Sequence, residues 1–167
     1  FSTTFLNTLA DATYNIRAYS TIAGHSSLPS DVVHLVVDTT PPTTFAFDQN
    51  TVSTDNFINA TERDRSVALT GTGEPFATLE WQLENTSTGV IGSTYSAQVG
   101  ADGTWRLPMG WSALGQVGDG QLKLSIKQTD LAGNTATQIH TRDFTLDTQV
   151  FSPRLASVTA DNLVNLV

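Results

Sequence analysis

Acidic side chains are the groups in this sequence that are best suited to chemistry. The chain has 16 Asp and Glu residues against 8 Lys and Arg, which gives a formal net charge of −8. A cluster of carboxylate, amide and carbonyl oxygens is a suitable binding site for Ca2+, which takes about six to eight oxygen ligands. The acidic balance argues against a nucleic-acid-binding face. The absence of cysteine excludes disulfides, thiol catalysis and thiolate zinc sites.

Alternating apolar and polar residues predict that β-strands position these acidic groups. Leu79, Trp81 and Leu83 alternate with polar residues, and residues 122–126 repeat the pattern, as in strands with one face in a core. Gly71-Thr72-Gly73-Glu74-Pro75 is interpreted as a turn at a strand end. Seven strands are predicted, at residues 43–48, 66–72, 78–85, 93–99, 103–107, 121–129 and 135–146.

Seven short antiparallel strands in about 110 residues indicate an all-β fold, an immunoglobulin-like antiparallel β-sandwich. Residues 53–65 are expected to form a loop between the first two strands, and residues 108–118 a longer crossing loop that could include one helical turn. The predicted core contains Trp81, Trp105, Leu69, Leu124 and Phe144.

Three motifs recur along the chain. Asp38-Thr39-Thr40-Pro41-Pro42 returns as Asp147-Thr148-Gln149, Ile22-Ala23-Gly24-His25 as Leu131-Ala132-Gly133-Asn134, and Asp55-Asn56-Phe57-Ile58-Asn59 as Asp161-Asn162-Leu163-Val164-Asn165, after 109, 109 and 106 residues. A period of this length indicates tandem copies of one small domain. We therefore predict the C-terminal part of one copy at residues 1–38, a complete copy at 39–147 and the start of a third at 148–167.

The alternating strand directions of a sandwich sort its loops, and with them the acidic residues, to two ends. The end where the chain enters is expected to carry Asp38, Glu74, Asp130 and Asn134, with Asp11 added from the preceding copy. The opposite end is expected to carry Asp55, Asn56, Glu62, Asp119 and Asp147. Each set offers only oxygen ligands, so each is a candidate calcium site.

Turn capping is the alternative role for these residues, because Asp and Asn side chains bond local backbone groups in loops. Asn59, Asp64 and Asp161 are assigned to that role. The three histidines are far apart in the sequence, and no nucleophile–base pair is evident, so the sequence does not predict an enzyme. Trp111, in the crossing loop, could pack over the edge of the sandwich or form a carbohydrate platform.

The chain resembles the bacterial immunoglobulin-like repeats of giant type I-secreted surface adhesins and biofilm-associated proteins. The matching motifs are Val37-Asp38-Thr39-Thr40-Pro41-Pro42, Asp55-Asn56-Phe57-Ile58-Asn59 with Glu62, Gly71-Thr72-Gly73-Glu74-Pro75, Ala101-Asp102-Gly103-Thr104-Trp105 and Asp130-Leu131-Ala132-Gly133-Asn134-Thr135. Two departures occur: the partial first copy aligns Thr21 and His25 with Asp130 and Asn134, and the second junction lacks the double proline.

The resemblance implies a long stalk of repeats, secreted to the bacterial cell surface, in which calcium at the domain junctions provides stiffness. Its partners would be the neighbouring repeats of the same chain, and the stalk would project a distal domain toward a host surface, a glycan or a biofilm matrix. An alternative is a module that itself binds a glycan or a host protein. A third interpretation is an accessory domain of a secreted hydrolase. No apolar run is long enough to span a membrane.

Overall fold

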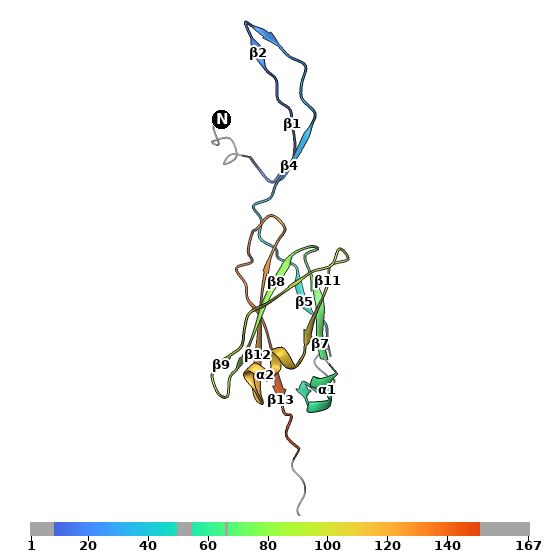
Figure 1. Ribbon diagram of the computed structural model, residues 1–167, viewed down its shortest axis with the longest axis vertical. Coiled ribbons are helices and arrows are strands. Elements are labelled where there is room, and N and C mark those ends of the chain that lie inside the picture. The colour runs from blue at the N-terminus through green and yellow to red at the C-terminus, as the bar shows by residue number, and fades with distance from the viewer. Residues whose placement is uncertain (1–8, 50–54, 66, 151–167) are drawn as a thin grey trace, which may run out of the picture.

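The computed structural model describes residues 9–49, 55–65 and 67–150, which form a narrow two-stranded arm followed by a β-sandwich (Figure 1). The arm continues the long axis of the sandwich, and the chain leaves the sandwich at the opposite end. The predicted third copy lies beyond Val150 and therefore falls outside the described residues, apart from its first three positions. So does Asp161.

The sandwich consists of two sheets, in which every strand pair is antiparallel except that of β6 with β13. The larger sheet has the order β10 (Tyr95–Gln98), β8 (Thr78–Asn85), β12 (Gly120–Thr129), β13 (His140–Leu146) and β6 (Phe57–Ile58), and β9 (Val90–Ile91) also pairs with β8. The smaller sheet has the order β11 (Thr104–Met109), β7 (Val67–Gly73) and β5 (Phe45–Phe47). All seven predicted strands are present, and the predicted all-β, immunoglobulin-like fold is confirmed.

The core lies between the two sheets and contains the predicted residues. Trp81 and Trp105 are 4% and 3% exposed, and Leu69, Leu124 and Phe144 are also buried. They occupy inward-facing positions on strands in which buried and exposed residues alternate, which is why a period of two in the sequence identified them. Trp81 stacks on Tyr95 with ring centroids 4.6 Å apart.

β7 extends through Gly71 and ends at Gly73, so the turn predicted at Gly71-Thr72-Gly73-Glu74-Pro75 is confirmed only in its second part, at residues 74–76. Gly71 pairs with Trp105 across the smaller sheet. A Cβ atom at Gly71 would overlap the Trp105 ring and the carbonyl oxygen of Ala46. The indole N–H of Trp105 donates to the carbonyl of Thr72 at 2.9 Å. The ring thus packs directly on the backbone of β7, where glycine has no side chain to block it.

Two segments predicted as loops contain regular structure. In the segment predicted as a loop at residues 53–65, β6 pairs with β13 in parallel and is followed by helix α1 (Ala60–Asp64). The crossing segment contains helix α2 (Trp111–Val117), which is longer than the single turn predicted. A two-residue strand and a five-residue helix are too short to produce a periodic signal.

The arm repeats the pairing of β12 with β13. Strand β1 (Ala12–Ile16) pairs with β4 (Val33–Val37), and β2 (Thr21–Ile22) pairs with β3 (His25–Ser26). Residue pairs of the arm match residue pairs of the sandwich when the first strand is shifted by 108 residues and the second by 109. The matches are Ala12↔Val37 with Gly120↔Leu146, Tyr14↔Leu35 with Leu122↔Phe144, and Thr21↔Ser26 with Thr129↔Thr135.

This register corrects one alignment made from the sequence. It places Ile22, rather than Thr21, at the position of Asp130, because the turn of the arm is one residue shorter. That turn has positive φ at Ala23 (48°) and Gly24 (85°), the backbone of a two-residue hairpin turn.

Replacing Gly71 by alanine should destabilise the sandwich by about 2 kcal/mol or more, because the added methyl group overpacks against Trp105. Chemical denaturation measures the free energy of unfolding. Thr72→Ala, a change on the exposed face of the same strand, is the control and should have little effect. Equal stability of the two variants would contradict the packing described for Trp105.

Candidate junction sites at the two ends of the sandwich

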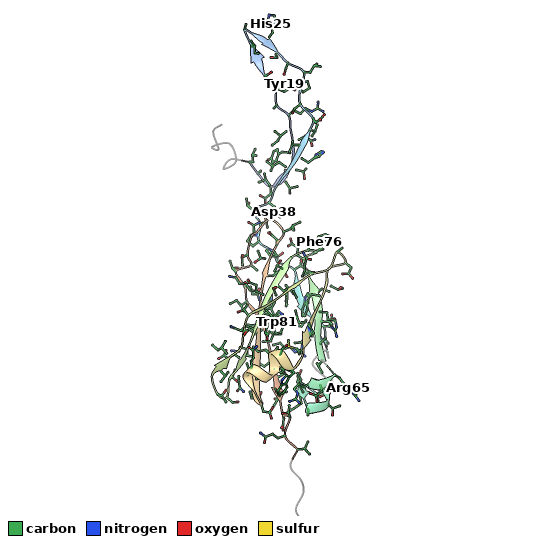
Figure 2. All side chains as sticks on the ribbon, viewed as in Figure 1. Tyr19, His25, Asp38, Arg65, Phe76 and Trp81 are labelled. Atoms are coloured by element: carbon green, nitrogen blue, oxygen red, sulfur yellow. The ribbon has the colours of Figure 1, made fainter. Side chains whose placement is uncertain are left out.

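The acidic residues lie at the two ends of the sandwich. We call the end that meets the arm the arm end; it carries Asp38, Glu74, Asp130 and Asn134. The other end, where the chain leaves after β13, is called the exit end. Figure 2 shows Asp38 between arm and sandwich, Phe76 close to that end, and Arg65 at the opposite one.

At the arm end, Asn134 bonds both to Asp130 and to the linker. Its backbone N–H donates to Asp130 Oδ1 at 2.8 Å, and its Nδ2 donates to Asp130 Oδ2 at 2.9 Å. The same Nδ2 donates to the backbone carbonyl of Asp38 at 3.0 Å. The five-residue turn from Asp130 to Asn134 thereby connects the end of β12 to the start of the linker.

The charges at the arm end act on one another. Burial, followed by the negative charges of Asp130 and Asp38, raises the pKa of Glu74 above its ordinary 4.5. Burial alone would raise the pKa of Asp130. Hydrogen bonds from Asn134 and from the backbone of Gly133 and Ala132 outweigh this effect and hold the pKa below 3.8. Glu74 is therefore the carboxylate that gains most from a nearby positive charge.

Asp11, which was expected to join this group, instead bonds to the linker on the arm side. Its Oδ1 accepts the backbone N–H of Thr39 at 3.0 Å and the Thr39 hydroxyl at 2.8 Å, and its Oδ2 accepts the Thr40 hydroxyl at 2.7 Å. The hydroxyl groups of Thr40 and Thr39, together with the Thr39 amide, lower the pKa of Asp11.

The exit end repeats this arrangement. Asp119 accepts the backbone N–H of Thr148 at 3.1 Å and the Thr148 hydroxyl at 2.9 Å, which are the contacts of Asp11 and Thr39 one period later. Asp147 Oδ1 accepts the backbone N–H of Gln149 at 3.1 Å, as Asp38 accepts that of Thr40 at 3.0 Å. Gln149 occupies the position of Thr40 one period later.

The other predicted residues of the exit end also take part in hydrogen bonds, which are local for Glu62 and Asp55 and distant in sequence for Asn56. Glu62 and Asn59 form a capping box at the start of α1, with both bonds at 3.0 Å. Asn56, at a φ of 62°, accepts the Arg142 guanidinium at 3.1 Å. Asp55 accepts the backbone N–H of Phe57 at 3.0 Å. Asn59 has the capping role that the sequence assigned to it.

Two open hollows divide the exit-end carboxylates. One, of about 670 Å3, is lined by Asp55, Glu62 and Asp147 among others, and a second of about 370 Å3 contains Asp119. The exit-end oxygens therefore do not converge on one point. At the arm end, burial is the main cause of the raised pKa of Glu74, and the charges of Asp130 and Asp38 contribute to it.

Across residues 9–49, 55–65 and 67–150, no three His, Cys, Asp or Glu side chains are grouped closely enough to hold a metal ion. The arm-end residues fit calcium in ligand chemistry, since they offer carboxylate, amide and carbonyl oxygens. They also fit electrostatically, since a cation would offset the repulsion that Glu74 experiences. A bound ion would require the carboxylates of Glu74 and Asp38 to move toward Asp130.

Asn85 is the structural residue that the sequence analysis missed. It is completely buried, and its Nδ2 donates to the carbonyls of Val117, Gly118 and Asp119 at 2.9, 3.2 and 3.0 Å. Its Oδ1 accepts the backbone N–H groups of Ser87 and Thr88. Asn85 thus fixes the chain just before Asp119. Its position at the end of an alternating strand, before Thr-Ser-Thr, was the available signal.

Trp111 connects the two helices of the exit end. The Arg63 guanidinium of α1 lies 4.3 Å from the centroid of the Trp111 ring, a cation–π contact. A Cβ atom at Gly115 would lie 3.2 Å from the same ring, so the ring also packs on its own helix. Trp111 is 64% exposed, but Arg63 covers one face of the ring, which leaves less of it for stacking on a sugar.

Sequence comparison now places the fold in a family. The bacterial Ig-like domain family matches residues 39–148. The chain belongs to this family. A comparison with curated proteins finds no match. Among the helices of the described residues, none is long and apolar enough to cross a membrane.

Solved structures of large adhesion proteins are similar to the chain. A tetra-tandem repeat from the extending region of a large adhesion protein is 23% identical, with a TM-score of 0.48, and the match covers 83% of this chain and 32% of that one. A Ca2+-stabilized adhesin that helps an Antarctic bacterium bind ice is 24% identical, with a TM-score of 0.43, covering 90% and 36%.

A bacterial immunoglobulin-like domain from the M. primoryensis ice-binding adhesin is 27% identical, with a TM-score of 0.36, covering 59% of this chain and 92% of that one. The chain spans about a third of the length of the two larger adhesin structures. Since all three TM-scores are below 0.5, the family assignment rests on the sequence match over residues 39–148.

Asn85→Ala should lower the free energy of unfolding by about 3 kcal/mol, because it leaves several buried backbone groups without partners. It should also shift the NMR amide signal of Thr148, which depends on the position of Asp119. Asn15→Ala, at an exposed position of the arm, is the matched control. An unchanged Thr148 signal in a destabilised Asn85→Ala variant would separate the folding role of Asn85 from its role at the junction.

Proposed function

We propose that residues 39–147 are one structural repeat of a large bacterial surface adhesin, a spacer that projects a distal binding domain. The supporting observation is the repeated strand register: the arm reproduces the β12–β13 pairing one period earlier and lies end to end with the sandwich. Residues 1–38 are then the C-terminal part of a preceding repeat, to which β1 and β4 contribute strands, and residues 148–167 begin the next.

The side chains of the arm agree with this assignment. Tyr14, Leu35 and Val37 are the half-buried apolar residues of β1 and β4. Tyr14 and Leu35 occupy the positions of Leu122 and Phe144, which face the core of the complete sandwich. The arm thus has the inward face of a sandwich, as a repeat unit continuing upstream requires.

In this proposal calcium is the cofactor, and the arm end is its best site. The ion would be held by carboxylates of Asp38, Glu74 and Asp130 with the amide oxygen of Asn134, and it would lower the repulsion among them. Because Asp38 belongs to the linker and the other three belong to the sandwich, the bound ion would restrict motion at the junction. Asp55, Asn56, Glu62, Asp119 and Asp147 stay as the weaker candidates at the exit end.

The location and the partners follow from this role. A calcium-dependent spacer acts where calcium is plentiful, which is outside the cell, so we assign the protein to the secreted or cell-surface fraction. Its direct partners are the neighbouring repeats, and the distal ligand would be a host surface, a glycan or a biofilm matrix. The alternative, a glycan- or host-protein-binding repeat, depends on Trp111, whose ring is already partly covered by Arg63.

Calcium should raise the melting temperature of the chain, and chelation should lower it. Calcium at about 100 times its dissociation constant would add about 2.7 kcal/mol. Glu74→Gln should raise the melting temperature in chelator, because it removes a repelled charge, and should weaken the response to calcium. Glu80→Gln, which removes the same charge from the outer face of β8, is the control.

An identical calcium response in Glu74→Gln and in the unaltered chain would remove Glu74 from the site. A melting temperature that is independent of calcium would reject the cofactor. Magnesium should be a poorer substitute, because it demands near-ideal octahedral geometry.

The chain should have no hydrolase, transferase or redox activity, as expected for a spacer. Turnover of polysaccharide, ester and peptide substrates by the purified chain is the measurement. Reproducible turnover that disappears in a Glu62→Gln or Asp130→Asn variant would refute the structural role.

A further inference from the structure

We propose that direct hydrogen bonds hold the arm and the sandwich in a fixed relative orientation without any metal ion, and that Asn134 is the positioning residue. This inference rests on the proposed function only in treating the arm and the sandwich as neighbouring repeats. The interaction surface consists of the linker residues Asp38, Thr39 and Thr40. Asp11 of the arm and Asn134 of the sandwich form hydrogen bonds with this linker.

The linker is fixed to the arm by three hydrogen bonds. Asp11, directly before β1, accepts the Thr39 amide and both threonine hydroxyls over 2.7–3.0 Å. Since Thr39 and Thr40 follow β4 after Asp38, these bonds close the open end of the β1–β4 pair. The direction in which the chain leaves the arm is thereby set.

The same linker is fixed to the sandwich one residue earlier. Asn134 Nδ2 donates to the Asp38 carbonyl at 3.0 Å, across 96 residues of sequence. Both oxygens of Asp130 accept from Asn134, so the amide is held in the orientation that points an N–H at Asp38. Asn134 is half-buried, which limits the competition of water for this bond.

The residues that follow the linker bonds leave little freedom for a hinge. Pro41 and Pro42 have restricted φ angles. Thr40 and Pro41 each precede a proline, which disfavours the helical backbone conformation at both residues. Pro42 is buried against the sandwich. Hydrogen bonds thus restrain residues 38–40, and ring geometry and packing restrain residues 41–42.

The turn between the last two strands determines whether this tie can form. In the sandwich, the five-residue turn supplies Asp130 and Asn134. In the arm, the shorter turn carries Ile22 and His25 at these positions, and Ile22 is 78% exposed. A junction built on the arm's turn would lack the Asp–Asn pair, so successive junctions of one chain would differ in stiffness according to this turn.

NMR of the chain in chelator tests the tie. Residual dipolar couplings of the β1 and β4 amides report how the arm is oriented relative to the sandwich, and cross-strand NOEs between Ala12 and Val37 report that the arm is folded. In the unaltered chain, arm and sandwich should fit one alignment tensor. Asn134→Ala should reduce the alignment of the arm by about half, as expected for a joint that becomes mobile, while the NOEs persist.

A second variant and a control keep the test decisive. Replacing Thr39 and Thr40 together by valine removes the hydroxyls on the arm side and should also uncouple the arm. Gln138→Ala, at an exposed amide near the start of β13, should leave the coupling intact. Separate alignment tensors for arm and sandwich in the unaltered chain in chelator would overturn the tie. Absence of the cross-strand NOEs in the unaltered chain would overturn it too, because the tie requires a folded arm.

Adding calcium separates this proposal from the proposed cofactor role. Coupling in chelator with no response of the melting temperature to calcium would support the tie and reject the calcium site. Independent tumbling in chelator that calcium converts to a single alignment would reject the tie and support the calcium site.

Discussion

Strand β12 is the element on which both junction sites depend. It pairs with β8 along one edge and with β13 along the other, so its position in the larger sheet is fixed from both sides. Asp119 directly precedes it and Asp130 directly follows it. Because ten residues of extended chain span roughly 34 Å, one strand sets the separation of Asp119 and Asp130 and places them at opposite ends of the sandwich.

The burial of β12 explains why so much of the fold could be predicted from the sequence. Leu122, Leu124 and Ile126 face the core, and the alternation that this burial imposes is visible in the sequence without any tertiary information. The same argument identified Trp81 on β8 and Trp105 on β11. It failed at Gly71, because a glycine that makes room for a neighbouring ring looks, in sequence, the same as a glycine that forms a turn.

The sites were harder to predict because side-chain partners depend on register. The sequence placed Asp38, Asp130 and Asn134 at one end, and the structure brings these three into one hydrogen-bonded group. It could not assign Asp11 to Thr39, since that bond depends on where β1 pairs with β4. Glu62 shows the reverse case: the local signal of its capping box with Asn59 was present in the sequence, but the sequence analysis considered Glu62 only as a metal ligand.

The hydrogen-bonded tie and a calcium ion at the arm end are physically compatible. A carboxylate has about four acceptor positions on its two oxygens, and Asn134 uses one on each oxygen of Asp130. A cation could bind the Asp130 carboxylate while the tie persists, in competition with the backbone N–H groups of Ala132 and Gly133 that also interact with it. The tie would then hold Asp130 and the Asp38 backbone in place before the ion arrives, so that ordering the linker would cost less entropy on binding. The side chains left to move are those of Asp38 and Glu74. The raised pKa of Glu74 reflects burial beside two like charges, and a cation would relieve that repulsion.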